Sequence, residues 1–83
     1  MPLFMDIHAH VAGVTAEAVA GAHEQDLAIQ AEYGVRYLKY WVDEGAGKIF
    51  CLVDAPSKEA AIAVHRESHG LVADELFEVK EGE

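Results

Sequence analysis

One run of the chain, residues 48–70, constrains its fold more than any other. It opens with an apolar stretch, 48–53, whose hydrophobic residues occupy both parities, as expected of a central strand covered on both faces. Pro56 ends that stretch, Ser57 is placed to cap a helix, and Gly70 is placed to end it. The run therefore predicts a buried strand followed directly by a helix.

The remaining elements follow from hydrophobic period and turn residues. Alternation predicts a strand over 3–10, and helix-forming residues predict a helix over 16–33 between Thr15 and Gly34. β-branched and aromatic residues predict an edge strand over 35–42, and two glycines predict a hairpin loop over 43–47. A last strand is predicted over 76–80. The order β-α-β-β-α-β predicts an α+β, ferredoxin-like fold. It would have a four-stranded antiparallel sheet in the order 4-1-3-2 with both helices on one face, in a single domain covering 1–83.

Composition limits the partners. The 83 residues carry a formal net charge of −9, which argues against nucleic acid and against anionic membrane surfaces, and suits a cation partner. No apolar run approaches the roughly 18 residues of a membrane span. The N-terminal sequence has no signal-peptide pattern, and the single cysteine, Cys51, suits a reducing compartment, so we expect a cytoplasmic protein.

His65 and His69 form the sharpest chemical motif. Four residues apart on the predicted helix, they share one face and can offer two imidazoles to one borderline divalent ion. The alternative is a helix end whose histidines interact with the helix dipole.

His8 and His10 form a second pair, two residues apart on the first strand, with Asp6 on the same parity as a candidate oxygen ligand. The topology brings the ends of the first strand and second helix to one edge of the domain. Because Leu3, Met5 and Ile7 have the apolar parity, the histidines are predicted on the face away from the helices. They would reach His65 and His69 only around the end of the sheet, or they would belong to a separate site on the open face.

Cys51 is either a soft metal ligand or a small buried hydrophobe in mid-strand. Tyr37, Tyr40 and Trp41 could line a cavity, but core or dimer-interface packing is the simpler interpretation.

The segment Cys51-Leu, Ala55-Pro-Ser and His65-x-x-x-His-Gly, together with Gly34-Val-Arg-Tyr-Leu, resembles a family of small bacterial proteins that includes a nickel-binding member. The resemblance covers most of the chain. It implies a dimeric ferredoxin-like domain with nickel as ligand, and it carries over residue by residue to Cys51, His65 and His69.

Two functions are therefore predicted. The first is a small metal-binding protein, for nickel or another divalent transition metal, that sequesters the metal or maintains its level. It would be a homodimer through the open sheet face, with ligands from His65, His69, His8, His10, Asp6 and Cys51. The second, less favoured, is a cofactor-free monooxygenase- or isomerase-like enzyme of the dimeric α+β barrel type, with His65 or His8 as base beside a cavity lined by Phe4, Phe50 and Trp41.

Overall fold

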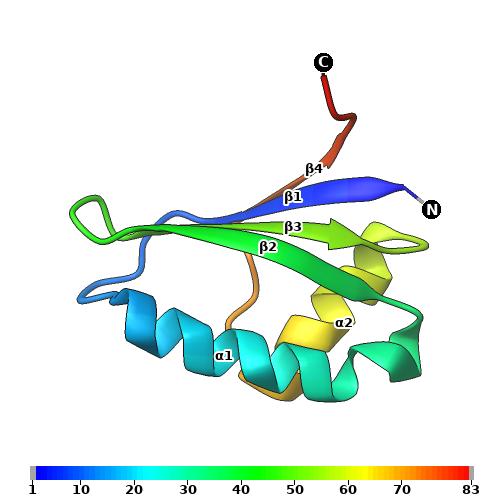
Figure 1. The fold of residues 1–83 in the computed structure, drawn as a ribbon, viewed down its shortest axis with the longest axis horizontal. Helices are drawn as coiled ribbons and strands as arrows, with labels where there is room; N and C mark the ends of the chain where they lie inside the picture. Colours follow the sequence, from blue (N-terminus) through cyan, green and yellow to red (C-terminus); the bar gives the residue numbers. More distant parts are fainter. Residues whose placement is uncertain (1, 83) are drawn as a thin grey trace.

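A computed structural model describes residues 2–82 and shows the predicted order of elements (Figure 1). These are β1 (Leu3–His8), α1 (Ala16–Ile29), the 3-10 turn η1 (Gln30–Tyr33), β2 (Arg36–Asp43), β3 (Lys48–Asp54), α2 (Lys58–Ser68) and β4 (Glu75–Val79).

The sheet is antiparallel throughout, with the order β2-β3-β1-β4. Both helices cover the same face, and the other face is left open (Figure 1). The ferredoxin-like topology predicted from the sequence is thus confirmed, with β3 central and β2 at an edge. No helix within residues 2–82 has the length and apolarity needed to cross a bilayer.

Side-chain caps start both helices where the sequence predicts. The Thr15 hydroxyl accepts a hydrogen bond from the Ala18 amide at 3.1 Å, and Ser57 accepts one from Ala60 at 3.2 Å. The first helix ends earlier than expected, because its last turn tightens into η1. Gly34 closes that turn with φ of 68°, a left-handed conformation that glycine adopts without strain.

The predicted orientation of the first strand is wrong. Phe4, Asp6 and His8 face the helices and are at most 4% exposed, whereas the alternate residues of β1 lie on the open face. The period of two is correct, but the face with Phe4, Asp6 and His8 is buried instead of the face with Leu3, Met5 and Ile7. The reason is that α2 supplies His65 as a partner for the Asp6 carboxylate, so burial does not leave Asp6 without a charge partner.

The first strand also ends at His8 rather than His10. The Ala9 amide donates to Asp74 Oδ2 at 2.7 Å, and the Val11 amide donates to the Gly47 carbonyl at 2.9 Å. These bonds lead the chain out of the sheet and toward the β2–β3 hairpin, so His10 is exposed in a loop.

Apolar side chains form rows across the open face. In the strand register, Trp41 lies opposite Phe50 and Phe50 opposite Ile7, while Leu52 lies opposite Met5 and Met5 opposite Phe77. Directly opposed residues of antiparallel strands project to the same face. Trp41 and Phe77 are each 49% exposed.

Candidate metal site

Polar side chains from three elements meet between the sheet and the helices. Asp6 comes from β1, Asp26 from α1 and His65 from α2, and all three are at most 3% exposed. Asp26 follows Val19 by seven residues, which places both on the buried stripe of α1. Buried ionisable groups are rare unless paired, so their partners decide what this cluster can do.

His65 is held between the two carboxylates. Its Nε2 is 2.9 Å from Asp6 Oδ2 and its Nδ1 is 3.0 Å from Asp26 Oδ1. Carboxylates only accept hydrogen bonds, so both ring nitrogens must donate, and this requires the doubly protonated, cationic imidazole.

The protonation of His65 follows from these contacts. Burial alone would lower its pKa, but hydrogen bonds and charge attraction from Asp26 and Asp6 outweigh burial and raise the pKa to about 9. The metal-free protein therefore carries a buried imidazolium at neutral pH.

The carboxylates respond in the opposite direction. Burial raises the pKa of each, but hydrogen bonds with the histidines dominate and hold both pKa values below the ordinary range. Ser68 supports Asp26 by donating its hydroxyl to Oδ1 at 2.6 Å. The Tyr37 hydroxyl lies 3.0 Å from the Ala61 carbonyl and 3.3 Å from Asp6 Oδ2, and burial beside Asp6 raises its pKa, so it remains a neutral donor.

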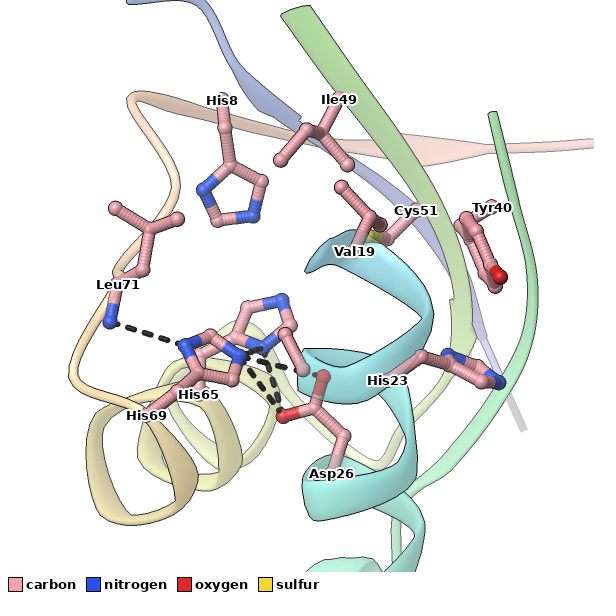
Figure 2. Close-up of a pocket in the computed structure, with 11 residues that line it drawn as sticks. His8, Val19, His23, Asp26, Tyr40, Ile49, Cys51, His65, His69 and Leu71 are labelled. Atoms are coloured by element: carbon pink, nitrogen blue, oxygen red, sulfur yellow. Dashed lines mark hydrogen bonds and ion pairs between the residues drawn. The ribbon is translucent and has the colours of Figure 1, made fainter. Parts of the chain in front are cut away.

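His69 joins the cluster from the C-cap position, directly after α2. Its Nε2 lies 3.1 Å from His65 Nδ1 and 3.2 Å from Asp26 Oδ1. With the His65–Asp26 contact of 3.0 Å, two nitrogens and one oxygen form a nearly equilateral triangle (Figure 2). His65 Nδ1 and His69 Nε2 can both donate a hydrogen bond to the Asp26 carboxylate. The two ring nitrogens then lie side by side with no hydrogen bond between them.

A second group of donors lies on the other side of His65. Asp6 and Cys51 are directly opposite in the β1–β3 register, and His8 Nε2 is 3.4 Å from Asp6 Oδ1. Asp6 Oδ1 and His8 Nδ1 are buried without a hydrogen-bond partner in residues 2–82. Each buried polar atom without a partner lowers the stability of the fold by on the order of 1–3 kcal/mol. Burial and the Asp6 carboxylate raise the pKa of the Cys51 thiol, which is therefore a thiol and no nucleophile in the metal-free protein.

A cavity of about 30 Å³ adjoins both groups, and is large enough for one or two water molecules. His8, Cys51, His65 and His69 contribute to its wall, and Leu71 lies beside its edge (Figure 2). The topological argument that His8 shares an end of the domain with His65 and His69 is therefore confirmed.

His10 lies apart from this cluster. It lines an exposed hollow formed by the β1–α1 loop and the β2–β3 hairpin, and Glu44 is an acidic residue of the same wall. Glu44 already accepts the Ala16 amide at 2.8 Å.

The three aromatic residues predicted to line an enzyme's cavity in a dimer do not share one face of the sheet. Phe4 packs on the helix side of the sheet, whereas Phe50 and Trp41 lie on the open face. The sheet separates these aromatics, and it also separates His65 and His8 from the open face. Of the other predicted cavity residues, Tyr37 is in the core. Tyr40 packs against His23, with ring centroids 4.8 Å apart, and lines the cavity beside the candidate metal site.

Sequence reasoning missed Asp26 altogether. The only sequence signal for it is an acidic residue of low helix propensity inside the predicted helix, one heptad after Val19. The many alanines of α1 blur its apolar stripe and hide this position.

The fold and the buried His/Asp/Cys groups define a small ferredoxin-like protein with side chains suited to a divalent transition metal. The profile of the nickel responsive SCO4226-like proteins matches residues 4–79, and the chain belongs to this family. It is also similar to a solved structure described as SCO4226 from Streptomyces coelicolor A3(2). The two are 38% identical over 98% of this chain and 99% of that one, with a TM-score of 0.89. A comparison with curated proteins found no match.

Proposed function

We propose that this protein binds a nickel ion between His65 Nδ1, His69 Nε2 and Asp26, and that it sequesters nickel or maintains its level in the cytoplasm. The triangle of donor atoms carries the proposal. Metal–ligand bonds of about 2.1 Å set neighbouring ligands of an octahedral ion about 3.0 Å apart. The three observed separations are 3.0, 3.1 and 3.2 Å.

A cation in this position would also bind both His65 Nδ1 and His69 Nε2, which otherwise lie side by side without a hydrogen bond between them. Two imidazoles and one carboxylate on one side of an ion leave its remaining positions for water. The family description supports nickel as that ion. Another divalent transition metal with the same preference for imidazole would fit the same donors.

Metal binding requires a proton rearrangement at both histidines. His65 must release its Nδ1 proton. His69 Nδ1 accepts the Leu71 amide at 3.1 Å, so the proton of a neutral His69 ring is on Nε2. That proton must move to Nδ1 before Nε2 can bind the metal, and the Leu71 contact must then break. Nickel binding is therefore expected to move the segment after α2.

Removing the Asp26 carboxylate tests this assignment. Asp26→Asn should weaken nickel binding at least roughly 100-fold, since direct ligands matter no less than the groups that orient them. Glu24→Gln is the matched control, because it removes one carboxylate from the exposed side of the same helix. Calorimetric titration of metal-free protein with nickel chloride gives both affinities, and circular dichroism confirms folding. Equal affinity in Asp26→Asn and Glu24→Gln would refute the site.

We also propose that the open face forms a homodimer. The apolar rows on this face are continuous, and large exposed apolar patches mark interaction sites. A two-fold axis parallel to the strands would place β2 of one copy over β4 of the other and bring the apolar rows of the two copies together. The apolar match of the two faces favours a second copy as the occupant.

The dimer is expected to dissociate when an apolar residue of the open face is replaced by a charged one. Wild-type protein should elute with twice the 9.0 kDa mass of the chain in light-scattering chromatography, and Phe77→Asp with the single mass. Leu27→Asp is the control, because Leu27 is 44% exposed on the helical side. Wild-type protein that stays monomeric up to millimolar concentration would refute the dimer and leave the face to another partner.

A further inference from the structure

The donors on the Nε2 side of His65 are not used by the proposed nickel ion. Asp6, His8, Cys51 and His65 come from β1, β3 and α2, and each offers a ligand atom within 4.8 Å of all the others. All four side chains are buried. In Figure 2, His65 lies between His8 on one side and Asp26 on the other, so the two groups of donors share this ring.

Two atoms of this group are unsatisfied in the metal-free protein. Asp6 Oδ1 and His8 Nδ1 have no hydrogen-bond partner in the described chain, although both residues are at most 3% exposed. His8 Nε2 is 3.4 Å from Asp6 Oδ1. Buried polar atoms are almost always paired, and a bound ion is one way to satisfy them.

The chemistry of the donors differs between the two sides of His65. The nickel triangle has two nitrogens and one oxygen, with His69 partly exposed, so it is open to water. The Asp6–His8–Cys51–His65 group has two nitrogens, one oxygen and one sulfur, and is closed. Four protein ligands including a thiolate are typical of a tetrahedral structural zinc site. A thiolate ligand also selects softer ions such as zinc. The nickel triangle offers only nitrogen and oxygen and has no such ligand.

We propose that Asp6, His8, Cys51 and His65 form a second metal position, selective for zinc. Zinc binding displaces the Cys51 thiol proton and the His65 Nε2 proton to solvent, and forms bonds to Sγ and Nε2. When nickel is also bound, His65 has lost both ring protons and bridges the two ions as an imidazolate. The bridge rests on the proposed nickel site, whereas the zinc position does not.

Native mass spectrometry and cobalt absorption test the proposal on metal-free, full-length protein. With zinc and nickel both supplied, each chain should bind one zinc and one nickel ion, which differ in mass. Cobalt(II), used as the spectroscopic probe for zinc, should give a thiolate-to-metal charge-transfer band. Cys51→Ala should lose this band and bind zinc at least 100-fold more weakly, while it still binds nickel.

The converse variant separates the two sites. Asp26→Asn should lose nickel but keep zinc and the cobalt–thiolate band. If wild-type protein binds nickel but shows no thiolate band with cobalt, the second position is refuted and the nickel site stands. If it binds zinc with the band but no nickel, the nickel site is refuted and the second position stands.

Folding of the variants is checked independently. Cys51→Ser serves as a second variant of similar size, and circular dichroism of both metal-free variants should match wild type. Zinc affinity that is unchanged in either variant would refute the assignment of Cys51. The wild-type cobalt spectrum needs no variant, so the proposal remains testable even if both variants fail to fold.

Discussion

Replacing His65 with alanine is expected to destabilise the metal-free protein by about 3–5 kcal/mol at pH 7. The imidazolium is the cation between Asp6 and Asp26, which approach it to 2.9 and 3.0 Å. Without it, two buried carboxylates lose their charge partner, and they must either stay charged in an apolar setting or take up protons. Either outcome has a cost comparable to breaking a buried ion pair.

Urea unfolding of metal-free protein measures this effect, with His10→Ala as the matched control. His10 is an exposed histidine outside the cluster, so its removal should change the free energy of unfolding by less than about 0.5 kcal/mol. A loss below about 1 kcal/mol for His65→Ala would mean that His65 is not the cation that balances the carboxylates.

The second large effect is a loss of stability between pH 6.5 and 9 in the metal-free protein. The pKa of His65 rises from 6.5 to about 9 on folding, so folding favours the protonated ring. This contribution is fully present below pH 6.5 and is lost as pH rises through 9. The shift corresponds to a decrease on the order of 3 kcal/mol.

The carboxylates set the acid limit of the same stability profile. The pKa values of Asp6 and Asp26 are lowered on folding, so their contribution is present above about pH 4 and is lost as pH falls further. Stability should therefore be highest between about pH 4 and 6.5. Urea unfolding at a series of pH values checks the profile, and His65→Gln should remove the alkaline decline. A wild-type protein equally stable at pH 6.5 and 9 would contradict a raised His65 pKa.

Much of the fold was predictable because it depends on local signals. Thr15 and Ser57 cap their helices as the sequence indicates, and the alternation of elements leaves few topologies once right-handed crossovers are imposed. The same topology brought His8 to the end of the domain where His65 and His69 lie.

The orientation of β1 and the role of Asp26 were not predictable by the same means. A period of two shows that Asp6 and His8 share a face, but it does not show which face is buried. Leu3, Met5 and Ile7 have the apolar side chains typical of a core, yet they belong to the apolar open face. Only contacts between distant segments explain the result, because the partner of Asp6 is His65 and the partner of His65 is Asp26.

Anomalous diffraction at the nickel absorption edge tests the central claim most directly. Crystals of metal-free protein would be grown and then loaded with one equivalent of nickel per chain. The account predicts one strong peak bounded by His65 Nδ1, His69 Nε2 and Asp26, with the Leu71 amide released from His69. Peaks confined to exposed side chains such as His10, with the His65–Asp26 contact unchanged, would contradict it.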